Sequence, residues 1–184
     1  MSHFTNHNGV FLVVILMLAG CSSSRQRKEG IQELEKLQAD VHGLHILVSA
    51  GVTKQEYSQR FEDVLLKLGD LNQNATETVP KFPQGEQETA KTVYAHLSQS
   101  INAYKKARVY FGDSFEGYSC EGGCSFFPQS EYDAVKREFP TLAELNLSPV
   151  AHEYHRSSML QALWAVAGEE DDQAKRLVDE FNQK

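Results

Sequence analysis

Two pairs of histidines stand three residues apart in this chain, and imidazole is a side chain that proteins commonly use to bind metals. His42 and His45 form the first pair, and His152 and His155 form the second. Residues three apart lie on one face of a helix. Two such pairs on neighbouring helices could therefore bind zinc, copper or haem between them.

The surrounding sequence favours a structural role for these histidines. His42 and His45 follow the apolar positions Val41 and Leu44, which places them at the flank of a helix, and His155 also stands beside an apolar residue. Neither the C-x-x-C-H haem attachment sequence nor the H-E-x-x-H zinc-protease motif occurs in the chain. Because structural histidines are commoner than histidine ligands, we expect no metal and no other cofactor.

Cys120 and Cys124 enclose a short segment that contains two glycines. Glycine lets the chain turn, so the two sulfurs can meet at disulfide geometry. A disulfide across so short a loop would contribute only about 2 kcal/mol and would mainly shape the loop. Redox exchange and soft-metal binding are the alternatives. A C-x3-C pair occurs in copper-handling proteins of the thioredoxin fold, but their strand–helix–strand pattern is missing here. We therefore expect a structural disulfide.

Aromatic residues are frequent between positions 94 and 127, and the later ones fall in an irregular segment around the two cysteines. Buried aromatic side chains most often serve the core, but a helical core cannot easily accommodate all of those in this segment. An exposed aromatic patch is a typical binding surface for a protein partner, and a small ligand is the alternative. We expect such a surface at Tyr118, Phe126 and Phe127.

The sequence contains none of the familiar catalytic motifs. There is no G-x-S-x-G, no glycine-rich phosphate-binding loop, and no pairing of carboxylates beyond helix faces and caps. The formal net charge is −7, which argues against nucleic acid as a partner because its phosphates require basic surfaces. We therefore expect a protein that is not an enzyme.

The first twenty residues have the character of a targeting segment. Residues 9–20 form an unbroken run of apolar and small residues that is too short for a comfortable membrane-spanning helix. The run ends in Leu18-Ala19-Gly20-Cys21, which resembles the lipobox of bacterial lipoproteins. The resemblance covers residues 1–21 and implies cleavage before Cys21 and a diacylglycerol on its thiol. An uncleaved signal anchor is the alternative.

Residues 21–29 are polar, so we expect them to form a flexible tether between the lipid and a helical domain at 30–184. In lipoproteins of Gram-negative bacteria, an aspartate directly after the cysteine favours retention in the inner membrane. Position 22 is serine, so the resemblance implies the periplasmic face of the outer membrane. It also removes Cys21 from the count of three cysteines, which leaves Cys120 and Cys124 as an even pair for an oxidising compartment.

Apolar periodicity predicts an all-α domain with an N-terminal αα-hairpin. From Ile31 to Val48 the apolar residues alternate three and four apart, as they do from Tyr57 to Leu71. Gly51 should end the first helix, and Thr53 with Glu56 forms a capping box for the second. The turn is so short that the two helices must pack antiparallel.

The remaining segments predict a four-helix-bundle-like domain with extra short helices. We expect a loop at 72–85, a third long helix at 86–111, a short helix capped by Ser130, and a further turn after Thr141. A helix should begin at Pro149 and extend to Ala167, with the acidic residues 169–172 starting a last helix after Gly168. The sequence is compatible with either a break or a bend of the helix at Gly168.

Overall fold

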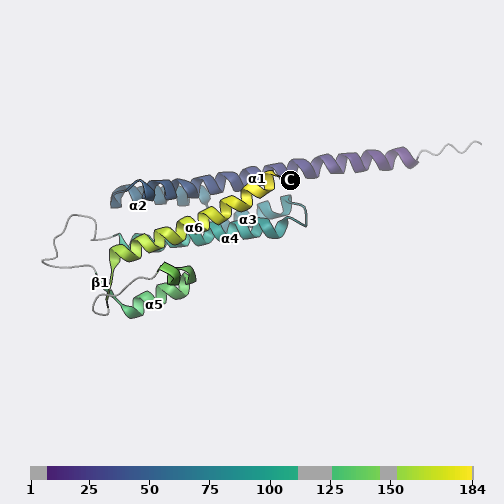
Figure 1. Cartoon of the computed structure of the whole chain (residues 1–184). Helices are drawn as coiled ribbons and strands as arrows, with labels where there is room; N and C mark the ends of the chain where they lie inside the picture. Colours follow the sequence, from purple (N-terminus) through teal and green to yellow (C-terminus); the bar gives the residue numbers. More distant parts are fainter. Residues whose placement is uncertain (1–7, 112–125, 146–152, 184) are drawn as a thin grey trace, which may run out of the picture.

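The computed structural model describes residues 8–111, 126–145 and 153–183, and it confirms the all-α fold (Figure 1). Four long helices form the bundle: α1 (Asn8–Ser49), α2 (Lys54–Leu68), α4 (Gln87–Tyr110) and α6 (Arg156–Asn182). The shorter elements are α3 (Leu71–Thr78), η1 (Val79–Lys81), α5 (Gln129–Glu138) and η2 (Pro140–Leu145). The two short strands are β1 (Phe126–Pro128) and β2 (Glu153–His155).

The predicted hairpin of α1 and α2 is confirmed, together with its local signals. Gly51 has φ +84°, a left-handed conformation that glycine adopts without steric cost. The Thr53 hydroxyl accepts from the amide of Glu56, whose carboxylate accepts from the amide of Thr53. Val52 and Tyr57 are both buried, as a hydrophobic staple requires.

The predicted apolar seams form the core of the bundle. Leu34, Val41 and Leu44 of α1 are fully buried, and Phe61 and Val64 of α2 are at most 1 % exposed. Helix α6 packs along α4 and also against α1, so its broad apolar band is enclosed from two sides. Burial of these side chains is the main source of stability in such a bundle.

The structure corrects the predicted loop at 72–85. Residues 71–78 form helix α3, and residues 79–81 form η1. The carboxylate of Asp70 accepts from the amides of Asn72 and Gln73, at 2.9 and 3.3 Å, and so caps α3. This N-cap accounts for the helix, since it satisfies amides that have no partner inside the first turn.

Three predictions about the second half need correction. The short helix α5 is present, but it begins at Gln129, so Ser130 lies inside it and does not cap it. Residues 153–155 form β2, which pairs antiparallel with β1, so the prediction that a helix covers these residues is wrong. Helix α6 continues through Gly168 to Asn182, so this glycine does not break it and the acidic residues lie mid-helix. Ser148 and Pro149 lie outside the described residues.

The predicted flexible tether at 21–29 is helical instead. These residues belong to α1, which extends past the other helices (Figure 1). Arg25 pairs with Glu29 across one turn at 3.0 Å, and Arg27 contacts both Glu86 and the end of α6. Such contacts provide interaction energy that a flexible segment would lack, so the helix continues.

Candidate functional site

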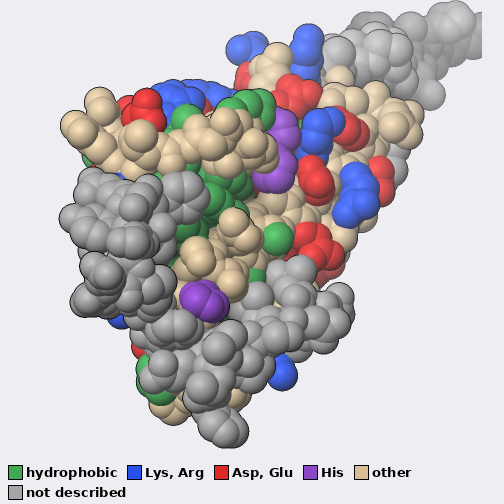
Figure 2. Space-filling model, turned by 60° about the vertical axis from the view of Figure 1, so that its left-hand side comes forward, with side chains coloured by type: hydrophobic (Ala, Val, Ile, Leu, Met, Phe, Trp, Pro, Cys, Tyr) green, Lys and Arg blue, Asp and Glu red, His purple; other side chains and the backbone are tan. Residues whose placement is uncertain are grey.

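One of the two predicted histidine pairs lies in a buried polar cluster between α1 and α6. Nδ1 of His42 lies 2.7 Å from Oδ2 of Asp171, and Nε2 of Gln38 donates to Oδ1 of the same carboxylate at 3.1 Å. Asp171 has no exposed surface, whereas the His42 side chain is one-third exposed. Figure 2 shows a histidine patch beside acidic and basic side chains on one face of the molecule, and a second histidine apart from it.

The environment of Asp171 changes its protonation equilibrium. Burial raises the pKa of this carboxyl above its ordinary value, and the hydrogen bonds from His42 and Gln38 oppose the shift without cancelling it. A buried carboxylate needs such partners because an unpaired charge inside a protein costs several kcal/mol. The cluster thus joins α1 to α6 through polar contacts at Asp171, where the other positions of this helix face pack through apolar side chains.

His45 completes the cluster through packing. Its ring stacks on that of His42 with centroids 5.7 Å apart, and its Nδ1 is buried with no hydrogen-bond partner among the described residues. A Cβ at position 168 would lie only 2.5 Å from this Nδ1. Gly168 is therefore needed for the close approach of α6 to His45.

A second histidine–carboxylate contact joins α6 to α4. Nδ1 of His96 on α4 lies 2.6 Å from Oε2 of Glu170, and one turn away the hydroxyl of Ser100 donates to the carbonyl of Ala167 at 2.8 Å. Consecutive acidic residues of α6 therefore contact different helices, Glu170 with α4 and Asp171 with α1. In the described ranges, no group of three histidine, cysteine or acidic side chains could hold a metal ion.

The other predicted site residues are not brought to this cluster. His155 ends β2 and precedes α6, so the expectation that His152 and His155 share a helix face is wrong at His155, while His152 lies outside the described residues. Phe126 and Phe127 belong to β1, and Cys21 belongs to α1. Three further predicted residues, Tyr118, Cys120 and Cys124, also fall outside the described residues.

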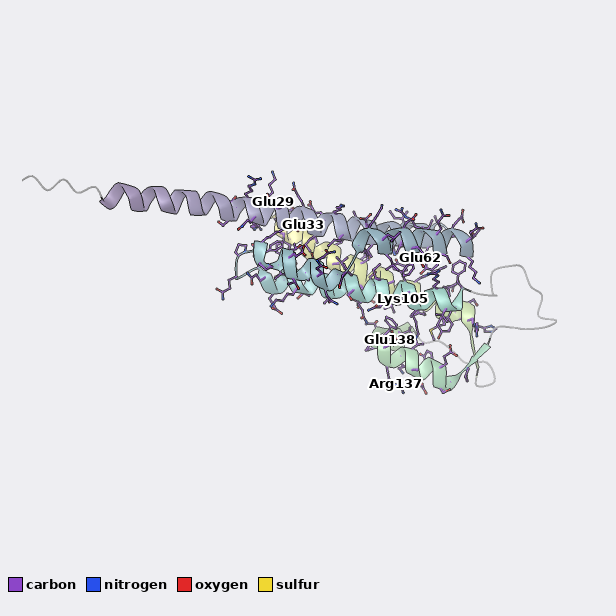
Figure 3. All side chains as sticks on the ribbon, turned by 180° about the vertical axis from the view of Figure 1, so that it is seen from behind. Glu29, Glu33, Glu62, Lys105, Arg137 and Glu138 are labelled. Carbon is purple, nitrogen blue, oxygen red and sulfur yellow. The ribbon has the colours of Figure 1, made fainter. Side chains whose placement is uncertain are left out.

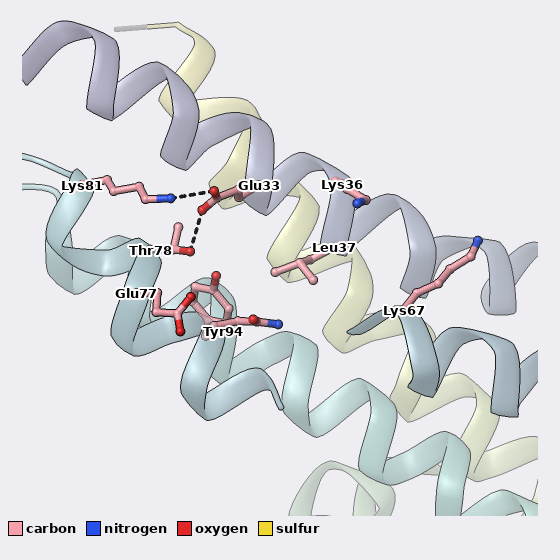
Figure 4. A pocket seen from close by; sticks show the side chains of 9 residues that line it. Glu33, Lys36, Leu37, Lys67, Glu77, Thr78, Lys81 and Tyr94 are labelled. Carbon is pink, nitrogen blue, oxygen red and sulfur yellow. Dashed lines mark hydrogen bonds and ion pairs between the residues drawn. The ribbon is translucent and has the colours of Figure 1, made fainter. Parts of the chain in front are cut away.

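A pocket of about 250 Å³ opens where α1, α2, α3 and α4 meet (Figure 4). One wall carries a fixed acidic group: Glu33 accepts from Nζ of Lys81 at 2.6 Å and from the hydroxyl of Thr78 at 2.7 Å. Burial would raise the pKa of Glu33, but these two partners outweigh it and lower the pKa. The lining residues are Glu33, Lys36, Leu37, Lys67, Asn74, Glu77, Thr78, Lys81 and Tyr94.

Tyr94 supplies an unused polar group to this pocket. Its side chain is only 5 % exposed, and its hydroxyl is buried without a hydrogen-bond partner in the part of the chain that the structure describes. Burial raises the pKa of Tyr94, although the nearby Thr78 hydroxyl acts in the opposite direction. A buried hydroxyl without a partner is costly, and a bound molecule or an ordered water would satisfy it.

The sequence interpretation missed Asp171 and Tyr94 as polar groups of interest. A signal for Asp171 was present, because positions 171, 174, 178 and 181 alternate three and four apart, and all four are buried. An aspartate in a core register needs partners from another element. For Tyr94 the signal was weaker, since a tyrosine in an apolar stripe is usually satisfied by a neighbour.

The buried carboxyl of Asp171 leads to a prediction about the pH dependence of stability. A carboxyl whose pKa is raised by folding binds its proton more tightly in the folded state, so its contribution to stability is complete below the ordinary value of 3.8. That contribution is lost as the pH rises through the folded pKa. The free energy of unfolding of the wild type, minus that of Asp171→Asn, should therefore fall with rising pH, by at most about 1.4 kcal/mol per pH unit.

Urea unfolding at a series of pH values from about 3 to about 7 measures this difference. Asp172→Asn, which removes the exposed carboxyl next in the chain, is the matched control. A difference for Asp171→Asn that stays constant with pH, or that rises, would show that burial does not dominate at this site.

Comparison of the chain with protein-family models, with curated proteins and with solved structures finds no match. Among the residues that the structure describes, none of the helices combines the length and the apolar character that crossing a membrane requires.

Proposed function

We propose that this chain is a lipid-anchored lipoprotein on the periplasmic face of the outer membrane, where its helical domain binds another envelope component without catalysing a reaction. The observation that carries the proposal is the Leu18-Ala19-Gly20-Cys21 motif at the end of a short apolar run. Ser22 supports the outer membrane over the inner one. Cys21 belongs to α1, whose N-terminal part extends past the other helices (Figure 1), and this arrangement is compatible with an anchor.

The polar contacts inside the bundle support a non-enzymatic role. Asp171 is occupied by His42 and Gln38, and Glu170 by His96, so these groups hold α6 between its neighbours. A general acid or base must instead reach a substrate atom at hydrogen-bond distance. The histidine–carboxylate contacts are thus better explained as links between helices than as catalytic pairs.

Replacing Cys21 with serine tests the anchor. The wild type should incorporate labelled palmitate and sediment with membranes, whereas Cys21→Ser should lose the label completely and leave the membrane fraction or stall as an uncleaved precursor. Cys120→Ser with Cys124→Ser is the matched control, and it should keep the label because those thiols are not lipidated. A mature-sized Cys21→Ser protein that carries no label yet remains in the membrane fraction would contradict the proposal and favour another means of attachment.

The aromatic segment is the proposed partner surface, and its test is a loss of binding. Cross-linking in intact cells followed by purification should recover a specific envelope protein with the wild type and at least tenfold less of it with Phe126→Ala/Phe127→Ala, since aromatic side chains dominate many interfaces. Leu66→Ala, which removes a side chain of α2 that is 81 % exposed, is the control. Equal recovery with the aromatic variant would eliminate this surface.

The pocket between α1, α2, α3 and α4 supports a second candidate function, the binding of a small molecule that carries both a positive and a negative charge. Figure 4 shows the ammonium groups of Lys36 and Lys67 on one side and the carboxylates of Glu33 and Glu77 on the other. Tyr94 lines the same pocket, and its hydroxyl, which has no partner among the described residues, could donate to the ligand. Free amino acids are suitable probes, and binding would raise the melting temperature of the wild type by an amount that grows with the logarithm of ligand concentration above the Kd.

A further inference from the structure

Helix α1 offers a rigid connection between the proposed lipid anchor and the bundle. Cys21 and Arg27 lie in the same helix, and Arg27 follows Cys21 by six positions, which corresponds to about 9 Å along the helix axis. The intervening segment contains neither glycine nor proline. Arg25 and Glu29 form an ion pair across the following turn at 3.0 Å. A continuous helix fixes the distance and the orientation between Cys21 and the residues that follow it.

Arg27 binds this helix to two other elements. Its Nε donates to Oε2 of Glu86 at 2.8 Å, and its Nη2 donates to Oε1 of Glu86 at 3.1 Å and to the carbonyl of Phe181 at 2.9 Å. The Arg27 and Glu86 side chains are only 23 % and 17 % exposed. A bidentate pair that is this well buried is a stronger and more directional contact than an exposed pair of charges.

Apolar packing reinforces the same junction. A Cβ at Gly30 would lie 2.8 Å from the ring of Phe82, so the loop before α4 rests directly on the backbone of α1. The ring of Phe82 in turn packs against that of Phe181, with centroids 4.8 Å apart. Nδ2 of Asn182 also donates to Glu35 of α1 at 2.8 Å. The bundle is thus fixed to α1 from Arg27 onward.

We infer that α1 holds the bundle upright on a lipid surface, with the 82–86 loop and the C-terminal end of α6 facing the bilayer. The inference rests on the proposed lipidation of Cys21, and it replaces a flexible tether with a rigid one. Position 21 is about 40 Å from the end of α1 at Ser49, so the α1–α2 turn points away from the membrane. Figure 3 shows Glu29 where α1 leaves the bundle and Glu62 towards the opposite end.

The test compares a fluorescent probe at the two ends of the lipidated full-length protein. Gln84 lies in the loop before α4 and Gln55 at the start of α2, and both are exposed. Each is replaced in turn by a labelled cysteine in a Cys120→Ser/Cys124→Ser background, after an unchanged melting temperature has been established. The protein is reconstituted in phosphatidylethanolamine–phosphatidylglycerol vesicles that contain a lipid with a nitroxide on its headgroup.

The probe at position 84 should be quenched several-fold more strongly than the probe at position 55. A ten-residue glycine–serine insertion after Ser23 provides the matched control, and it should abolish the difference because it allows the bundle to tumble. Equal quenching at both positions in protein that floats with the vesicles would overturn the rigid orientation alone. A difference that survives the insertion would also overturn the role of α1. Failure of the lipidated protein to float would contradict the anchor itself.

Discussion

Replacing Tyr57 with alanine should lower the free energy of unfolding by about 3–5 kcal/mol, the range found when buried aromatic side chains are truncated. Tyr57 has no exposed surface, and its ring lies 5.3 Å from that of Phe111 and 5.6 Å from that of Trp164, between ring centroids. These contacts join α2 to residues at the end of α4 and in α6. Alanine would leave a cavity where three helices meet.

The smaller substitution Tyr57→Phe separates packing from hydrogen bonding. The hydroxyl of Tyr57 donates to the carbonyl of Tyr104 at 2.7 Å, and the loss of one such bond costs about 1 kcal/mol. Tyr94→Phe is the matched control and should be neutral or stabilising in the absence of ligand, because its hydroxyl has no partner within the described residues. Urea unfolding measures all three variants. Equal costs for Tyr57→Ala and Tyr57→Phe would show that the ring contacts contribute little.

Gly168→Ala should destabilise the protein by about 1–3 kcal/mol, although alanine is the better helix former. The added Cβ would lie 2.5 Å from Nδ1 and 2.6 Å from Cε1 of His45. That ring is already stacked on His42, so it cannot withdraw without disturbing the contact between His42 and Asp171. The cost arises from overpacking at the junction of α1 and α6.

The double variant His45→Ala/Gly168→Ala identifies the cause. Once the ring is removed, Gly168→Ala should become stabilising by up to about 1 kcal/mol, the ordinary gain inside a helix. Gly43→Ala in α1 is the matched control, since the nearest atom to its added Cβ is the flexible end of Arg60 at 3.2 Å. A Gly168→Ala protein with a melting temperature as high as that of Gly43→Ala would contradict the proposed clash.

Features that depend on neighbouring residues in the chain were predictable. The capping box of Thr53 and Glu56 and the glycine at 51 involve backbone groups within four residues, and both are present as expected. The apolar seam of α1 depends only on helical geometry, so its alternation of three and four places Leu34, Val41 and Leu44 in the core. The N-cap residue Asp70 was an equally local signal for helix α3. The two prolines that follow it favoured a loop at 72–85 instead.

Features that depend on distant residues were not predictable from local pattern. Gly168 interrupts nothing, because its role is to admit His45 from a helix more than a hundred residues earlier in the chain. The polar stretch around Arg27 reads as a linker until Glu86 and the end of α6 provide partners for its guanidinium. A single sequence gives no distance between such residues, so neither contact could be inferred before the helices were packed.

By itself, the sequence determined the helical class and the α1–α2 hairpin, because periodicity and capping are properties of adjacent residues. The lipid anchor at Cys21 stays a prediction from a four-residue motif. Only the tertiary structure decided that α6 continues through Gly168, that Asp171 is a buried partner of His42, and that Arg27 holds α1 to the bundle. The physical reason is that a buried charge or a close helix contact gains its energy from groups that folding brings together.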